Sequence, residues 1–281
     1  LGFRGEALPT IAAVSRLSMA TRTRQAEGGH RVDLRWGELV RSGPQGCPPG
    51  TAVEALDIFG NLPARRKFLK SASAETSRVQ ELVSRYALAF PQVRFQLVAD
   101  GRPVLSTPGN GRPRETLLAI YGTETAGAML EIGGEDPETG YAVEGFVSPP
   151  SLHRANRSYM TFFVNRRWIQ SRMLSFSLEE AYHGLLPQKR YPLAVLNLSL
   201  PFGDVDVNSH PAKREVRLHQ EGKVFSVLQR AVRAAVVAGS PVPQAQLSGP
   251  SAGGAGPSYP PYYGGGTASY FSPTAFSDPQ K

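Results

Sequence analysis

Three stretches of this sequence combine residue types and spacings that suit phosphate binding. The first is "GFRGEAL", residues 2–8, in which Gly2 and Gly5 flank Phe3 and Arg4 directly before a predicted helix. Glycine lets a backbone approach an anion closely, and the first turn of a helix presents unpaired N–H groups. An arginine adds a charged donor. Phosphate binding is one interpretation, and an ordinary turn before a helix is the other.

The second stretch is "PGTAVEALDIFGNLPARRKFLK", which begins at Pro49. A strand is expected from Gly50, so the Thr51 hydroxyl stands at a strand edge, where it can hydrogen-bond a base or a water. Pro63 is expected to open a short helix. The basic cluster on that helix consists of Arg65, Arg66, Lys67 and Lys70. Such a cluster is either an anion-binding surface or a solvated helix face.

The third stretch is "GDVDVNSHPAKREVRLHQ", which begins at Gly203. Val205 and Val207 alternate with polar residues as in a half-buried strand, and Pro211 ends that strand. Lys213 is then expected on a loop. A lysine so placed can reach a terminal phosphate as a compact point charge, and the alternative is an ordinary surface lysine.

The composition limits which partners, cellular settings and kinds of site are expected. Lys and Arg outnumber Asp and Glu by 31 to 23, a formal net charge of +8, which favours polyanionic partners, although many basic proteins bind none. The single Cys47 suits a reducing, cytoplasmic setting. The five histidines lack zinc-ligand spacing, and the sequence has no Gly-x-Ser-x-Gly elbow and no Walker phosphate loop. We expect no metal site, no signal peptide and no membrane span.

Periodicity predicts a mixed α/β chain in which helices and strands alternate. Helices are expected near residues 6–17, 74–90, 114–122, 172–186 and 222–238. Strands are expected near residues 16–23, 30–36, 50–59, 141–148, 159–165 and 192–200, with a hairpin around Asp100-Gly101. Along the second helix, Val79, Leu82, Val83, Tyr86 and Phe90 share one face.

Two composition breaks predict three parts of the chain. The turn-rich "TPGNGRP" suggests a boundary that separates a first domain, residues 1–111, from a second, residues 112–240. Residues 241–281 are rich in Pro, Gly and Ser and carry only two charges, Asp278 and Lys281. Such a segment buries too little apolar surface to offset its conformational entropy, so we expect a disordered linker.

Taken in order, "LGFRGEAL", "GTAVEALDIFGNLPARRKFLK", "FFVNRRWIQSRML" and "DVDVNSHPAKREVR" resemble the MutL family of DNA mismatch repair proteins over residues 1–236. The family belongs to the GHKL ATPases. The resemblance implies an α+β fold: the C-terminal part of an α/β-sandwich ATPase domain, then a domain with the left-handed βαβ crossover of some ribosomal proteins.

The resemblance also implies residue roles. Gly2, Phe3, Arg4 and Gly5 would wrap the triphosphate of ATP, Thr51 would lie near adenine, and Lys213 would reach the γ-phosphate. Arg172 matches an arginine implicated in DNA contact, and the alternative is a solvent-exposed residue in the first turn of a helix. One departure is Arg166, which follows Asn165 where the family usually has Gly. A non-Gly residue at positive φ costs roughly 1 kcal/mol, so the turn is expected to differ locally.

In the family, an upstream Glu activates water, an Asn holds Mg²⁺ and an Asp-x-Gly-x-Gly motif reads adenine. None of these has a match here, because the sequence starts at the third ATP motif. We therefore interpret the chain as a fragment, and expect it alone to hydrolyse no ATP.

The leading functional hypothesis is the ATP- and DNA-binding part of a mismatch repair protein, which acts as an ATP-gated clamp between mismatch recognition and strand removal. Its expected partners are DNA, a MutS-type mismatch recognition protein and, in the full-length protein, a second copy. A non-catalytic DNA-binding module is the alternative, and it would bind DNA alike with and without ATP. A topoisomerase subunit is disfavoured, because "NLPARRKFL" and "VNSHPAKREV" together are particular to mismatch repair proteins.

Overall fold

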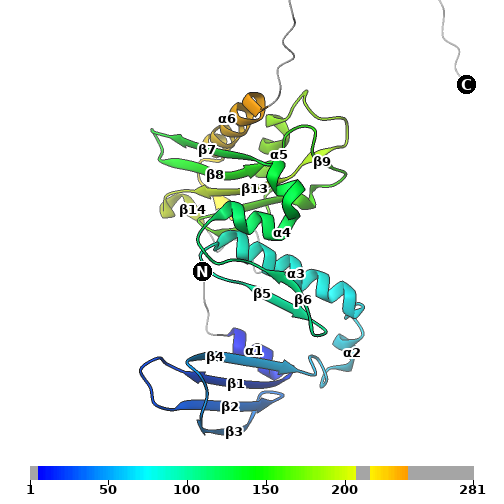
Figure 1. Cartoon of the computed structure of the whole chain (residues 1–281), viewed down its shortest axis with the longest axis vertical. Coiled ribbons are helices and arrows are strands. Elements are labelled where there is room, and N and C mark those ends of the chain that lie inside the picture. The colour runs from blue at the N-terminus through cyan, green and yellow to red at the C-terminus, as the bar shows by residue number, and fades with distance from the viewer. Residues whose placement is uncertain (1–5, 207–215, 240–281) are drawn as a thin grey trace, which may run out of the picture. The chain divides into compact units, whose positions relative to one another are not determined.

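The computed structural model describes residues 6–206 and 216–239 (Figure 1). Residues 1–241 form one unit by their internal contacts, and residues 242–281 lie outside the described residues. The predicted linker therefore lies outside them too, and the division at residues 111 and 112 stays a prediction. No helix in the described ranges is long and apolar enough to cross a membrane.

The chain enters its first sheet through helix α1 (Ala7–Ala13). This helix is shorter than the predicted 6–17, because the chain turns at Val14 and Ser15. The Ser15 hydroxyl donates to the Ile11 carbonyl at 2.7 Å, and the Trp36 N–H donates to the Ser15 carbonyl at 3.0 Å. Leu17, expected on the helix, is instead a buried residue of the first strand.

The first sheet is antiparallel with strand order β3-β2-β1-β4. Its strands are β1 (Arg16–Arg22), β2 (Gly29–Arg35), β3 (Glu38–Gln45) and β4 (Gly50–Leu56). Strand β3 was not predicted, because Gly43 and Pro44 interrupt its pattern. Proline lacks the N–H of a central strand but is tolerated at an edge, where β3 lies.

A helical segment follows the first sheet. Pro63 opens α2 (Pro63–Arg66) as predicted, and α3 (Ala72–Ala89) begins at Ser71, whose Oγ accepts from the Ala74 N–H at 3.4 Å. The hairpin of β5 (Gln96–Ala99) and β6 (Arg102–Ser106) turns at Asp100 and Gly101, both at positive φ. That turn confirms the predicted Asp-Gly hairpin.

A second sheet has strand order β11-β10-β13-β8-β7. Its strands are β7 (Leu130–Asp136), β8 (Tyr141–Val147), β10 (Met160–Val164), β11 (Arg167–Ile169) and β13 (Ala194–Ser199). Strands β10 and β13 are parallel neighbours, and the chain between them passes through helix α5 (Arg172–Ala181). This connection is the βαβ unit that the resemblance implied, within a mixed α/β architecture that the structure confirms.

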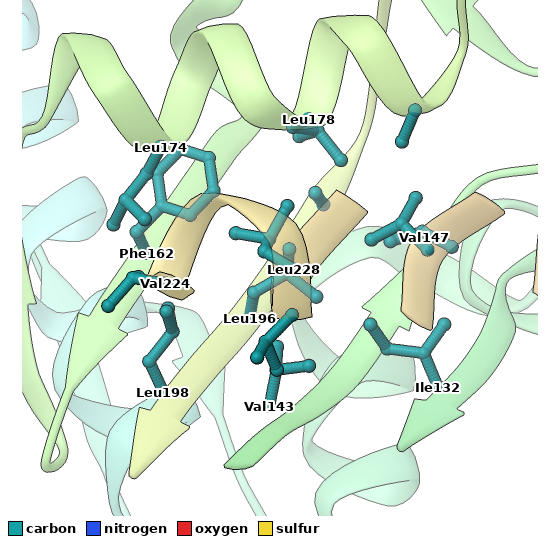
Figure 2. Close-up of a cluster of buried hydrophobic side chains, with 14 of the residues drawn as sticks. Ile132, Val143, Val147, Phe162, Leu174, Leu178, Leu196, Leu198, Val224 and Leu228 are labelled. Atoms are coloured by element: carbon teal, nitrogen blue, oxygen red, sulfur yellow. The ribbon is translucent and has the colours of Figure 1, made fainter. Parts of the chain in front are cut away.

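Helices cover both faces of the second sheet. Helices α5 and α6 (Glu221–Gly239) contribute Leu174, Leu178, Val224 and Leu228 to one face, where they meet strand residues such as Val143 and Leu196 (Figure 2). On the other face, Phe146, Phe163 and Val195 pack with residues of α4 (Pro113–Ala128) and with Ala89 of α3. The sheet is therefore the middle layer of a buried core.

Short elements complete the described chain. They are β9 (His153–Arg154), the 3₁₀ helix η1 (Arg157–Tyr159), β12 (Tyr191–Pro192), the 3₁₀ helix η2 (Phe202–Asp204), β14 (Val205–Asp206) and β15 (Arg217–Leu218). Strand β14 begins at Val205 as predicted, and its expected continuation to Val207 lies outside the described residues.

Candidate functional site

Arg172 is the first residue of helix α5 and is exposed. The helix begins there because the Ser171 Oγ accepts from the Leu174 N–H at 3.2 Å, and buried Leu174 and Leu178 anchor the helix in the core. A helix N-terminus carries a partial positive charge, and Arg172 adds a full one. This end of α5 is consequently suited to a phosphate group.

A cleft with a volume of about 1010 Å³ surrounds the N-terminus of α5. It brings together three arginines from separate elements, Arg85 of α3, Arg157 of η1 and Arg172. Its other lining residues include three serines and a group of large apolar side chains: Ser158, Ser171, Ser175, Met160, Trp168, Met173 and Phe176. Guanidinium groups, hydroxyls and aromatic rings together form the kind of surface that binds nucleic acid.

Two of the three arginines are fixed in place by protein partners. Arg85 pairs with Glu81, and its Cζ lies 3.9 Å from the centre of the Trp168 ring. Arg157 donates from Nε and Nη2 to the two carboxylate oxygens of Glu179, at 2.6 and 2.8 Å. These hydrogen bonds raise the pKa of the Arg157 guanidinium. Both arginines remain cationic, with part of their charge balanced by a carboxylate.

Arg172 differs from the other two arginines of the cleft. Within residues 6–206 and 216–239, no ion pair joins it to a carboxylate. Among the described residues its guanidinium is therefore not neutralised by an ion pair, and the acidic residues that line the same cleft are Glu179 and Glu221. The structure thus places the predicted DNA-binding arginine where an anion can reach it.

The turn at Asn165 and Arg166 positions strand β11, which carries Trp168 into the cleft. Both turn residues have positive φ, 50° and 64°, so the turn keeps the type I′ form although Arg166 replaces Gly. Asn165 fixes it by donating from Nδ2 to the Leu200 carbonyl at 3.0 Å and accepting from the Leu200 N–H at 2.9 Å. The side chain of Asn197 accepts the Arg166 N–H at 3.0 Å, and a difference from the turn of the family stays a prediction.

The predicted nucleotide residues are described only in part. Thr51 lies on β4, exposed, with its Oγ1 2.8 Å from that of Thr21. Gly2, Phe3, Arg4, Gly5 and Lys213 lie outside the described residues. A shared site for Thr51 and those residues therefore stays a prediction. Among the described residues, no group of His, Cys, Asp or Glu side chains is arranged to hold a metal ion.

The basic cluster after Pro63 is exposed, and within the described ranges none of its members forms an ion pair with a carboxylate. Asn61 ties this segment to α1 by donating from Nδ2 to the Ala13 carbonyl at 3.0 Å. The structure is consistent with either interpretation of the cluster. None of the residues of this basic cluster lines the cleft around Arg172.

Sequence reasoning missed Arg85, Arg157 and Trp168 as members of the cleft. Arg85 of α3 lies 72 positions before Arg157 of η1, and Trp168 of β11 follows Arg157 after a further 11 positions. No local spacing links them. Helix α3 packs against β11, and this tertiary contact brings the side chains together. Their proximity could therefore be recognised only from the folded structure.

Comparison with known proteins shows that this chain is similar to DNA mismatch repair proteins. The family model described as DNA mismatch repair protein, C-terminal domain, matches residues 117–237. The DNA mismatch repair protein MutL of Heliobacterium modesticaldum is 46% identical over 232 residues, 83% of this chain and 35% of that protein. The MutL of Desulforamulus reducens is 45% identical over 232 residues, 83% of this chain and 36% of that protein. The chain thus spans about a third of the length of these relatives.

Solved structures agree with the sequence relatives. The Aquifex aeolicus MutL ATPase domain complexed with ADP is similar with a TM-score of 0.59 at 28% identity, over 79% of this chain and 76% of that one. The N-terminal domain of a DNA repair protein is similar with a TM-score of 0.71 at 24% identity, over 85% of this chain and 76% of that one, and this likeness concerns the fold.

Proposed function

The chain belongs to the MutL family of DNA mismatch repair proteins, and from that premise we propose that it binds duplex DNA through the cleft around Arg172. The observation that carries the proposal is an exposed arginine at a helix N-terminus, inside a cleft that two further arginines line. Helix N–H groups and guanidinium forks both bind phosphate oxygens. Phosphate contacts hold a protein on a duplex without reading its sequence.

In this proposal each arginine of the cleft has its own role. Arg172 binds a phosphate, because no ion pair joins it to a described carboxylate, although Glu179 and Glu221 also line the cleft. Arg85 and Arg157, held by Glu81 and Glu179, keep the walls of the cleft cationic at a fixed geometry. Since most of the binding energy comes from phosphates, affinity falls steeply as salt rises.

The test is the affinity of the 281-residue chain for a fluorescently labelled duplex, measured by anisotropy at several salt concentrations. Arg172→Gln is expected to weaken binding about tenfold, the scale of one charge-assisted hydrogen bond, and to lower the slope of log K against log salt by about 0.9. Arg102→Gln, which removes an exposed arginine of β6, is the matched control. Unchanged binding by the Arg172 variant, or binding that ignores salt, contradicts the proposal.

We further propose that DNA binding is linked to ATP, so that the protein acts as an ATP-gated clamp between mismatch recognition and strand removal. Support comes from the similarity to a MutL ATPase domain complexed with ADP. Gly2, Phe3, Arg4, Gly5, Thr51 and Lys213 are the residues proposed to hold ATP with Mg²⁺. A MutS-type protein and a second copy of MutL are the proposed partners, in the cytoplasm.

The sequence has no match for the Glu, Asn or Asp-x-Gly-x-Gly motifs of the family. We therefore expect the 281-residue polypeptide to release no phosphate from ATP above background. Turnover that Lys213→Ala abolishes would refute this expectation. DNA binding that is identical with and without ATP would favour the simpler DNA-binding module.

A further inference from the structure

A second basic surface lies on a short ribbon of two strands, outside every stretch that the sequence singled out. Strand β9 pairs antiparallel with β12, so that Arg154 stands opposite Tyr191. Lys189 and Arg190 come directly before β12, and Arg157 begins η1, separated from the end of β9 by two residues. We call Arg154, Arg157, Lys189 and Arg190 the basic ribbon.

Tyrosine rings hold two of these arginines in place. The Cζ of Arg154 lies 5.3 Å from the centre of the Tyr159 ring, and the Cζ of Arg157 lies 4.8 Å from that of Tyr191. Arg157 also donates from Nε and Nη2 to Glu179, and Arg154 donates from Nη1 to the His153 carbonyl at 3.3 Å. The two arginines are thus oriented before any ligand arrives, which lowers the entropic cost of binding.

The other two cations lie on the turn that leads into β12. Lys189 and Arg190 are both exposed, and Lys189 has a φ of 58°. The Arg190 N–H donates to the Pro187 carbonyl at 3.2 Å, which closes the turn. A lysine at positive φ is a strained residue, and such strain is tolerated where the surrounding structure imposes it.

The charge of the basic ribbon is weakly balanced. In the described ranges, Arg157 is its one member with a carboxylate partner, Glu179, and no ion pair is formed by Arg154, Lys189 or Arg190. Three of four cationic groups are consequently available to an anionic partner. A cluster of like charges without counterions costs self-repulsion, which a polyanion relieves.

Arg157 belongs both to the basic ribbon and to the lining of the cleft around Arg172. The two basic surfaces are therefore continuous through one side chain. We propose that the basic ribbon binds the phosphate backbone of the same duplex whose phosphates reach Arg172. This inference rests on the proposed function, and it extends the DNA contact to the turn before β12. Continuity with the cleft favours DNA over an acidic polypeptide.

The experiment compares two charge-removing variants of the full chain on one labelled duplex. The double variant Lys189→Gln/Arg190→Gln removes two positive charges and keeps a polar side chain at each position. The slope of log K against log salt should fall by about 1.8, which is 0.9 for each phosphate contact, and affinity at 0.1 M salt should fall at least about tenfold. The charge-matched control is Arg35→Gln/Arg102→Gln, which alters exposed residues of β2 and β6.

Arg172→Gln, measured in parallel, separates the two proposals. If it weakens binding while the ribbon variant binds like the control, the basic ribbon has no part in DNA binding and this inference is wrong. If neither variant differs from the control, the proposed cleft fails as well. Normal DNA binding by a ribbon variant that has lost affinity for poly-glutamate would assign the ribbon to an acidic polypeptide instead. Restored affinity in Lys189→Arg/Arg190→Lys shows that charge, not folding, carries the effect.

Discussion

The two main sheets of this protein are both extensively hydrogen-bonded and are very different in burial. In β4 of the first sheet, every residue from Gly50 to Leu56 is exposed, and Leu17 is the buried apolar residue of its strands. In β8 and β13 of the second sheet, Val143, Val147, Leu196 and Leu198 are at most 2% exposed. Backbone pairing alone therefore gives a strand its shape, whereas burial requires a covering layer.

In the second sheet, the covering layer consists of helices on both faces. Helices α5 and α6 lie over one face and α4 over the other, each with apolar residues turned inward. Of the described helices, α1 covers part of the first sheet. The apolar side chains of β4 remain exposed although the strand is paired with β1. Burial on this scale is worth roughly 1.5–3 kcal/mol for each large apolar side chain, so the second sheet should dominate the stability of the chain.

The largest effect is expected at Gly145 of β8. A Cβ at this position would lie 2.1 Å from the Val195 carbonyl oxygen, and φ is +140°. Gly145→Ala must displace a strand of the core and strain the backbone, so the free energy of unfolding should fall by at least about 3 kcal/mol in urea denaturation. Gly133→Ala in β7, where no atom lies within 4 Å, is the matched control and should cost under about 1 kcal/mol. Equal losses would contradict the packing described here.

A pair of valines tests the contrast between the sheets directly. Val143 is 1% exposed and Val53 is 50% exposed. Val143→Ala should lower the free energy of unfolding by about 2 kcal/mol, and Val53→Ala by about 0.5 kcal/mol or less. Both are measured by urea denaturation with a probe for each sheet. A cost of about 2 kcal/mol at Val53 would show that the apolar face of β4 is covered in solution.

The smallest effect concerns two hairpins of the same turn type. Asp100-Gly101 has glycine at the second turn position, whereas Asn165-Arg166 has arginine there at a φ of 64°. Arg166→Gly should raise the free energy of unfolding by about 1 kcal/mol, and Gly101→Ala should lower it by a similar amount. Thermal melts followed by circular dichroism resolve such changes. Destabilisation by Arg166→Gly would mean that the arginine side chain has a structural role in the turn.

Much of this fold was predictable because local patterns and tertiary packing agree in the second sheet. The expected strands at residues 141–148, 159–165 and 192–200 correspond to β8, β10 and β13, and the helix at 222–238 corresponds to α6. Strand β7 was missed, since Gly133 and Gly134 lie in its middle. Residues 114–122 predicted a shorter α4, which continues to Ala128 across a kink at Gly122.

Sequence reasoning was weakest where burial depends on distant partners. Val79, Leu82 and Tyr86 of α3 read as an inward face, yet each is 45–48% exposed, and Ala87 and Ala89 are the buried residues of that helix. The amphipathic pattern identified the helix but not the layer against which it packs. The site shows the same limit: Arg172 was found from its motif, whereas the arginines beside it are brought there by the fold.

Amide hydrogen exchange of the 281-residue chain, with and without a saturating duplex at low salt, tests the central claim most directly. The account predicts that DNA slows exchange at the start of α5, residues 171–176, and along the basic ribbon, residues 153–158 and 188–191, while β1 to β4 exchange at unchanged rates. Slowing confined to the first sheet, or none at α5, would contradict the assignment of DNA binding to the cleft around Arg172.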